Sequence, residues 1–252
     1  MIADLIRSVV PARFRPIRYL ENLASARTNG CIPRGPFTGM RYITGSVGST
    51  LIPKLLGIYE RELNEYVERA CSLNFPLIVD IGAAEGYYAI GLARRNSNAR
   101  IVAFEMETKG QIALKEMAER NNVAERVEIR GKCELEDLQA TLADVDHAFV
   151  VCDTEGYEDV LLKPDAVPAL KRATILVELH DFIIPGITEE LKKRFGQSHR
   201  IEHVWQQPRS RAEFPYCTLG TMLLPKSYLD WAVSEWRPVR MAWLWMEPKV
   251  GI

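Results

Sequence analysis

Acidic side chains end several apolar segments of this 252-residue chain, and one histidine stands close to the last of them. Asp80, Glu105 and Asp153 each close such a segment, and Glu178 and His180 end a fourth. If these segments are parallel strands, their carboxyl ends share one edge of a sheet, where ligands bind in open α/β folds. We therefore expect these side chains to gather on a single rim.

The first acid precedes a turn of small residues, Asp80-Ile81-Gly82-Ala83-Ala84-Glu85-Gly86. This pattern predicts a strand, a tight turn and a helix, with a backbone that approaches a nucleotide-like ligand; a Cβ at either glycine would hold that ligand away. The turn lacks the G-x-G-x-x-G of dinucleotide sites. A carboxylate there repels a pyrophosphate but suits an ammonium and hydroxyls, as in S-adenosylmethionine. A tight turn without a ligand is the alternative.

Glu105 stands near the spacing from Asp80 that ribose-binding acids have. A carboxylate at this position can accept both ribose hydroxyls, so it fits NAD as well as a nucleoside methyl donor. The next predicted strand ends at residues 130–133, where side chains edge an adenine ring or merely form a connecting turn.

His180 is the candidate general base, because an imidazole with a pKa near ~6.5 can take a proton from a substrate hydroxyl. Asp153 would orient this base or contact the methionine ammonium, and Glu178 completes the predicted catalytic set. Asp153, Glu178, His180 and Asp181 could instead bind a divalent metal, which is the less favoured interpretation. A purely structural network is the third alternative.

The elements that must position these residues alternate regularly from Leu77 onward. Strands are predicted near 77–81, 100–105, 126–130, 147–153 and 173–179, and helices near 85–95, 108–121, 134–142, 156–163 and 187–196. Two further strands, near 200–206 and 218–224, would form an antiparallel pair at one edge. The prediction is an α/β fold with a Rossmann-like, doubly wound, seven-stranded and mostly parallel sheet.

Three parts are expected along the chain. Residues 1–57 form an N-terminal extension, rich in Gly and Pro from residue 28, with a short hairpin near 40–43 and a role in capping the substrate cleft. Residues 58–225 form the ligand-binding domain and begin with helical spacing over 58–70. Residues 226–252 form a Trp-rich flap packed on that domain.

Composition excludes several other classes of protein. With 32 basic and 33 acidic residues, the net charge of -1 gives no electrostatic argument for nucleic acid as a partner. No apolar run reaches the ~20 residues of a membrane span, and Met1–Val10 is too short and interrupted for a signal peptide. Five cysteines without a C-x-x-C pair disfavour a disulfide framework or structural zinc, so the cytoplasm is the expected location.

Four segments together resemble the FkbM-type methyltransferases: 57–63, 79–88, the Asp153-Thr154-Glu155-Gly156-Tyr157-Glu158 element, and 177–180. The resemblance covers about residues 57 to 182, and its Asp-x-Glu-Gly-Tyr-Glu element is the most specific part. It implies a class I methyltransferase fold, S-adenosylmethionine as donor, and a hydroxyl acceptor on a sugar or natural product. The family turn often has Asn at the position of Glu85.

The predicted function is therefore O-methylation of a hydroxyl on a small molecule or glycan. The predicted cofactor-binding residues are Asp80, Gly82, Ala83, Glu85, Gly86, Tyr88, Glu105, Met106, Cys133 and Asp153. Two alternatives stay open: a non-catalytic binding protein with this fold, and a nicotinamide-dependent oxidoreductase. A homodimer is a further open expectation.

Overall fold

The computed structural model describes residues 15–47 and 49–249, which fall into two compact units. The first unit contains the described residues up to Arg61 together with Gln207–Pro238, and the second contains Glu62–Gln206 and the described residues from Val239 onward. The first fourteen residues of the predicted extension, Met1–Val10 among them, lie outside the described residues, as do residues 250–252 of the predicted flap.

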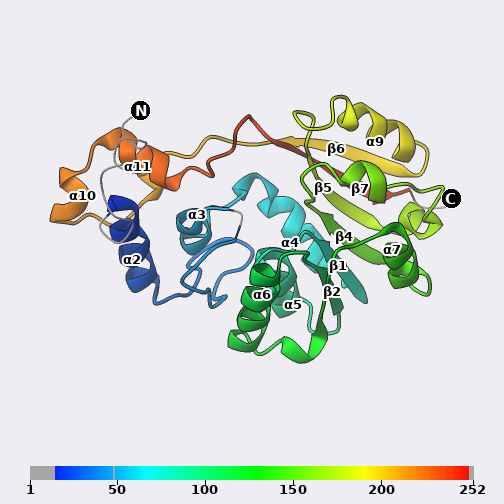
Figure 1. Ribbon diagram of the computed structural model, residues 1–252, viewed down its shortest axis with the longest axis horizontal. Helices are drawn as coiled ribbons and strands as arrows, with labels where there is room; N and C mark the ends of the chain where they lie inside the picture. The colour runs from blue at the N-terminus through cyan, green and yellow to red at the C-terminus, as the bar shows by residue number, and fades with distance from the viewer. Residues whose placement is uncertain (1–14, 48, 250–252) are drawn as a thin grey trace. The chain divides into compact units, whose positions relative to one another are not determined.

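The second unit is built on a seven-stranded sheet with the order β3-β2-β1-β4-β5-β7-β6 (Figure 1). Its strands are β1 Leu77–Ile81, β2 Arg100–Phe104, β3 Val127–Arg130, β4 Ala148–Cys152, β5 Thr174–Leu179, β6 His199–Trp205 and β7 Ala242–Pro248. Strands β1 to β5 are mutually parallel, and β7 runs antiparallel to both β5 and β6. The predicted fold class is thereby confirmed.

Helices cover both faces of this sheet, as the near-continuous apolar strands require. On one face lie α4 Asn64–Ser72, α5 Tyr87–Arg95 and α6 Thr108–Arg120; on the other lie α7 Leu135–Leu142, α8 Glu158–Leu161 and α9 Ile187–Phe195 (Figure 1). Short 3₁₀ turns occur at Arg61–Leu63, Ala124–Arg126 and Pro168–Arg172. These helices confirm the helices predicted from 85 to 196.

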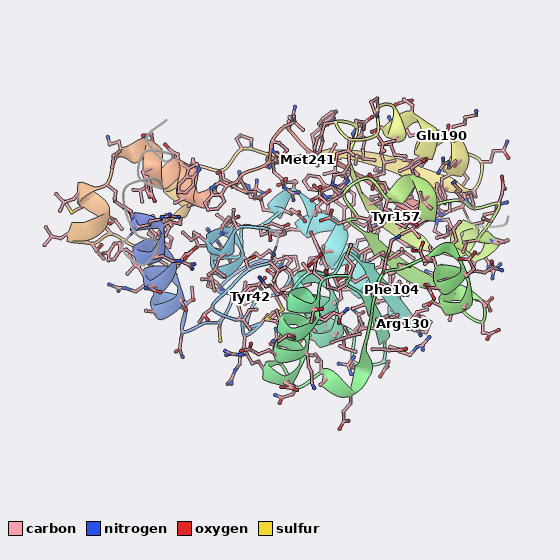
Figure 2. The ribbon with its side chains drawn as sticks, viewed as in Figure 1. Tyr42, Phe104, Arg130, Tyr157, Glu190 and Met241 are labelled. Atoms are coloured by element: carbon pink, nitrogen blue, oxygen red, sulfur yellow. The ribbon has the colours of Figure 1, made fainter. Side chains whose placement is uncertain are left out.

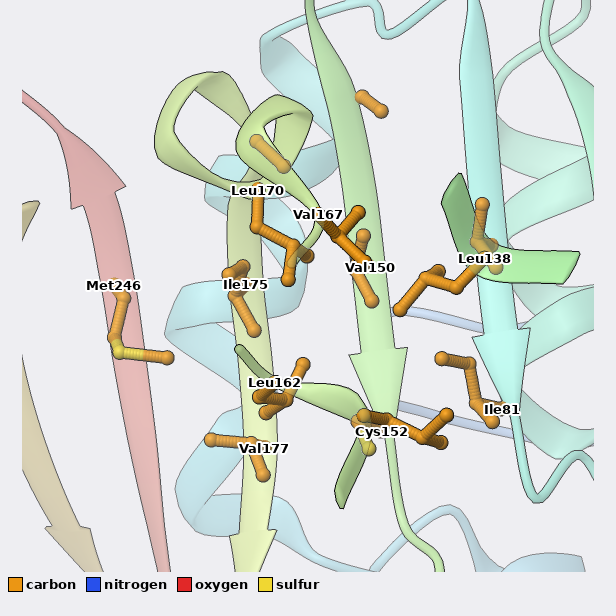
Figure 3. Close-up of a cluster of buried hydrophobic side chains, with 14 of the residues drawn as sticks. Ile81, Leu138, Val150, Cys152, Leu162, Val167, Leu170, Ile175, Val177 and Met246 are labelled. Atoms are coloured by element: carbon orange, nitrogen blue, oxygen red, sulfur yellow. The ribbon is translucent and has the colours of Figure 1, made fainter. Parts of the chain in front are cut away.

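A hydrophobic core lies between the central strands and α7, α8 and α9. Val150 and Ile175 contribute from β4 and β5, and Leu138 and Leu170 cover them from the helical layer (Figure 3). Side chains of this kind each contribute about 1.5–3 kcal/mol of burial free energy. The rigid layer that results fixes where each strand ends, and therefore where the rim residues lie.

The seventh strand is not the one that the sequence predicted. Residues 218–224 do not form a strand: Leu219–Leu223 is the short helix α10, capped by the Thr218 hydroxyl, which accepts a hydrogen bond from the Thr221 amide at 3.1 Å. The side chains of Leu219 and Leu223 are 81% exposed, so their apolar character did not indicate a buried strand.

The true seventh strand, β7, comes from the segment that was predicted to be a flap. It inserts between β5 and β6, and Trp245 at its centre is completely buried. Residues 226–252 therefore do not form one element: helix α11, Lys226–Val233, belongs to the first unit, while β7 belongs to the second. Among the described residues, no helix has both the length and the apolarity needed to cross a membrane.

The first unit contains α2 Pro16–Thr28, α3 Leu51–Leu56, α10, α11 and the 3₁₀ turn Arg211–Glu213. Near the predicted hairpin, its described residues show an isolated antiparallel bridge between Cys31 and Arg41. A fully buried ion pair, with Arg209 and Glu235 2.6 Å apart, lies inside this unit. Its boundaries differ from the predicted divisions at 57 and 225, and a capping role for the N-terminal extension stays a prediction.

Two glycines shape the turn between β1 and α5. Gly82 has φ +84°, and a Cβ there would lie 1.7 Å from the carbonyl oxygen of Asp153; Gly86 has φ +92°, and its Cβ would lie 2.2 Å from Leu114 Cδ1. Both values are in the left-handed region that favours glycine. The structure thus gives these glycines a reason within the protein itself, the close approach of neighbouring segments, and the approach of a ligand stays a prediction.

We expect Gly82→Ala to destabilise the protein by at least about 2 kcal/mol, because the added Cβ meets a backbone carbonyl and the φ angle is strained. Urea unfolding followed by circular dichroism measures the change. Gly131→Ala is the matched control, since a Cβ at Gly131 has open space, and it should change stability by less than about 0.5 kcal/mol. Equal stabilities of the two variants would contradict the assigned role of Gly82.

Candidate functional site

The predicted rim residues follow the ends of neighbouring parallel strands. Ile81 of β1 pairs with Phe104 of β2 and with Cys152 of β4, which places Glu105 and Asp153 one residue beyond the pairs. His180 directly follows β5, which neighbours β4. The carboxyl ends of these strands therefore form one edge, as predicted.

Glu105 is held at the side of the rim that carries the glycine turn. Its Oε2 accepts the Ala84 N–H at 2.7 Å, and its Oε1 accepts the Glu107 N–H at 2.6 Å. Gly110 lets helix α6 approach, since a Cβ there would lie 2.6 Å from Glu105 Cγ. A carboxylate offers about four acceptor positions, so each oxygen keeps capacity for a further donor such as a ribose hydroxyl.

The other acids of the turn are buried inside the protein. Asp80 Oδ2 accepts the Ala89 N–H at 2.8 Å and so fastens the first turn of α5 to the end of β1. Glu85 is completely buried, and Ala83 is also buried. Asp80 therefore stabilises the first turn of α5. Direct ligand contacts of Asp80 and Glu85 stay predictions.

Two of the predicted cofactor-binding residues, Met106 and Cys133, differ in exposure. Met106, directly after β2, is 66% exposed and offers apolar surface at the rim. Cys133 packs in the hydrophobic core, where burial raises the pKa of its thiol to about 12 and keeps it protonated. The side chain of Cys133 is thus part of the core, while that of Met106 is exposed at the rim.

Neighbouring side chains occupy the adjacent strand end and the start of α5. Arg130 lies over the ring of Phe104, 5.6 Å from its centroid, and donates to Thr141 Oγ1 at 2.8 Å (Figure 2). The half-buried Tyr88 meets Tyr87 edge-on, with ring centroids 5.4 Å apart.

His180 is the centre of the other side of the rim. Its side chain is only 1% exposed, and its Nδ1 lies 3.0 Å from Glu158 Oε1. Its Nε2 lies 3.6 Å from one oxygen each of Asp153 and Glu155, which is beyond hydrogen-bond length. The two ring nitrogens thus face different groups, one inside the protein and one toward the exposed acids.

Glu158 lies beside His180, and the sequence patterns did not single it out as a residue of the site. It is completely buried; Oε1 also accepts the His180 N–H at 3.2 Å, and Oε2 accepts the Gly156 N–H at 2.9 Å and the Thr154 hydroxyl at 3.2 Å. The structure gives Glu158 the position beside the imidazole that was predicted for Asp153. Its place at the end of the Asp-x-Glu-Gly-Tyr-Glu element was the available signal.

The charges around His180 act on its pKa in opposite directions. Burial lowers the pKa of the imidazole, but the hydrogen bond and charge of Glu158, with the charges of Asp153 and Glu155, outweigh burial and raise it above its usual value. Burial raises the pKa of Glu158, but the hydrogen bond to His180 and the charge of His180 outweigh burial and lower that pKa below its usual value. The carboxylate of Glu158 therefore favours a proton on Nδ1.

Glu178 and Asp181 are placed differently from the other rim acids. Glu178 is buried in β5 opposite Trp243 of β7. Asp181 accepts the Gly186 N–H at 3.2 Å and the Thr188 hydroxyl, at the start of α9. Among the described residues, the potential ligand atoms that lie within 4.8 Å of one another come from Asp153, Glu155 and His180, rather than from the predicted set with Glu178 and Asp181.

Comparison with solved structures places this architecture among known folds. The human methyltransferase 10 domain containing protein is similar over 91% of this chain and 96% of its own, at 13% identity and a TM-score of 0.50. An O-methyltransferase from Bacillus cereus solved in complex with SAH matches over 98% and 97%, at 16% identity and a TM-score of 0.46. A precorrin-6y C5,15-methyltransferase from Geobacter metallireducens matches over 72% and 88%, at 16% identity and a TM-score of 0.46.

The chain has the class I methyltransferase fold, on the basis of its sheet order and the likeness to the human structure. No protein-family model matches the chain, and neither does any curated protein. The resemblance to the FkbM-type family therefore stays a prediction. A fold does not determine a function, so the activity has to be argued from the site.

We expect Glu158→Gln to destabilise the protein by about 2–4 kcal/mol. The NH₂ group of the glutamine amide would lie against N–H or O–H donors whose hydrogen bonds a carboxylate oxygen now accepts, and the negative charge beside His180 would be lost. Urea unfolding measures the change in the free energy of unfolding, with a chelator present so that no metal ion contributes to it. Glu155→Gln is the control from the same loop: its side chain is 77% exposed, and the change should stay within about 0.5 kcal/mol. A Glu158→Gln protein as stable as that control would contradict a structural role for the buried carboxylate.

Proposed function

We propose that this protein is an S-adenosylmethionine-dependent methyltransferase that methylates a hydroxyl oxygen on a small molecule, sugar or natural product. The observation that carries the proposal is Glu105, a buried carboxylate fixed by two backbone N–H groups beside the glycine turn of a class I methyltransferase fold. The FkbM-type resemblance supports the same donor and the same class of acceptor.

The donor end is assigned by the chemistry that each position offers. Glu105 would accept the ribose hydroxyls, since its carboxylate is already oriented before any ligand binds. Met106 offers an exposed apolar side chain to the adenine ring, and Asp153 offers a carboxylate to the methionine ammonium. When bound, S-adenosylmethionine supplies a methyl group on a sulfonium, which is already electrophilic.

The protein then has to align the acceptor, exclude water and manage the hydroxyl proton. Because Glu158 engages Nδ1 of His180, Nε2 is the nitrogen that can act on an acceptor. His180 as the base, with Asp153 and Glu178 as the other members of the predicted set, remains the proposal from the sequence. The rim places Asp153 and His180 close together, which supports those two members.

Two other functions share part of this site. Glu105 would serve the ribose of NAD equally well, so a nicotinamide-dependent oxidoreductase is compatible with that residue alone. A non-catalytic protein would keep the fold without any affinity for the donor. Binding measurements with the free ligands separate these functions, and transfer of an isotopically labelled methyl group to a panel of hydroxylated metabolites, read by mass spectrometry, then identifies the acceptor.

We expect calorimetric titration to show binding of S-adenosylmethionine and S-adenosylhomocysteine, but not of NAD. Glu105→Gln should weaken binding of S-adenosylhomocysteine by about 10- to 100-fold, because one charged acceptor for the ribose is lost. Glu107→Gln is the matched control, an exposed acid two residues further along the same loop, and it should bind normally. Affinity for NAD alone would support the oxidoreductase, and no affinity for any of the three would overturn a donor-dependent activity.

A further inference from the structure

We propose that Asp153, Glu155 and His180 form a binding site for a divalent cation of the magnesium or manganese class. Asp153 and Glu155 come from the loop after β4, and His180 comes from the end of β5. Each residue offers one ligand atom, and these three atoms lie within 4.8 Å of one another. Carboxylate oxygens suit hard cations such as Mg²⁺ and Mn²⁺, while an imidazole nitrogen suits first-row transition metals, so Mn²⁺ fits both kinds of donor best.

The spacing of the ligand atoms fits a shared ion better than direct hydrogen bonds. His180 Nε2 stands 3.6 Å from Asp153 Oδ1 and 3.6 Å from Glu155 Oε2. Ligands at about 2.1 Å from a common ion stand roughly 3 Å apart when they are neighbours in octahedral geometry. Movements of a few tenths of an ångström by the exposed carboxylates would therefore complete the site.

A second, independent observation is the way in which His180 is held. The imidazole is 1% exposed, and its Nε2 points at the two outer carboxylates, while Nδ1 meets the buried Glu158 at 3.0 Å. A metal-binding histidine generally donates its other N–H to a carboxylate, which fixes the tautomer and the orientation of the ring. Glu158 occupies that supporting position and is itself fixed by Gly156 and Thr154.

The arrangement also indicates what a bound cation would do, and this step rests on the proposed function. The Glu155 side chain is 77% exposed and Asp153 is partly exposed, so the cluster is open to solvent on that side. Three protein ligands leave coordination positions there for an oxygen of the acceptor, whose hydroxyl pKa the cation would lower. Nε2 has a single lone pair, so as a metal ligand His180 would not also take the hydroxyl proton; that proton would pass to solvent water, and His180 would be the base only in a cation-free site.

The test measures Mn²⁺ binding to the full chain after chelator treatment and dialysis, using the loss of the free-ion signal in electron paramagnetic resonance. We expect one Mn²⁺ per chain, displaced by excess Mg²⁺. Glu155→Gln should weaken binding at least ~10-fold, because an anionic ligand becomes neutral. Glu189→Gln is the matched control, since the Glu189 side chain is 78% exposed, close to the 77% of Glu155, but lies on α9 outside the cluster; this variant should bind Mn²⁺ like the wild type.

Absence of stoichiometric Mn²⁺ binding, or equal affinity in the wild type and Glu155→Gln, would overturn the cation site. Glu155 was chosen because its exposed side chain can be changed without threatening the fold. Titration of the chelator-treated protein with S-adenosylhomocysteine keeps the two proposals apart. Donor binding without Mn²⁺ binding removes the cation site and leaves the methyltransferase proposal intact. Mn²⁺ binding without donor binding supports the cation site and overturns the methyltransferase proposal.

Discussion

The close approach of the β1 turn to the end of β4 is the constraint on which the rest of the site depends. Gly82 lies so near the Asp153 carbonyl that no side chain fits between them, and the Asp153 N–H donates to the Ile81 carbonyl at 2.9 Å. The glycine turn and the loop that carries Asp153, Glu155 and Glu158 are therefore neighbours at the ends of paired strands. Their relative position is fixed by backbone hydrogen bonds rather than by flexible side chains.

Two buried carboxylates continue this organisation on either side of that contact. Glu105 joins the glycine turn to the loop before α6, and Glu158 joins the loop after β4 to His180. Each accepts backbone N–H groups that a loop would otherwise leave unsatisfied. In both places the acid orders the backbone first and presents polar atoms to the rim second, so the groups at the rim are oriented before a ligand arrives.

Local sequence patterns were sufficient to predict most strands and helices and the position of the rim. Alternating apolar and helical segments located β1 to β6 and the helices between them, and strand-end acids located the rim. The seventh strand could not be predicted in this way, because it pairs with strands that are distant in the sequence. Residues 242–248 were predicted to be part of a separate flap, although Trp243 to Met246 is an unbroken apolar run typical of a strand covered on both faces. Glu158 was missed for a similar reason, because its partner His180 follows on the next strand.

The burial of Glu158 argues that the orientation of His180 matters for more than stability. Moving a carboxylate out of water costs several kcal/mol, and well-packed apolar residues often serve a core as well as a buried ion pair does. Here the carboxylate is retained at zero exposure, and four hydrogen bonds satisfy it, two of them from His180. One effect of this arrangement is that Nε2 stays aimed at Asp153 and Glu155 in a single tautomer. An imidazole held in this way is prepared to bind a proton or a cation at a defined point on the rim, which a histidine placed only for packing would not require.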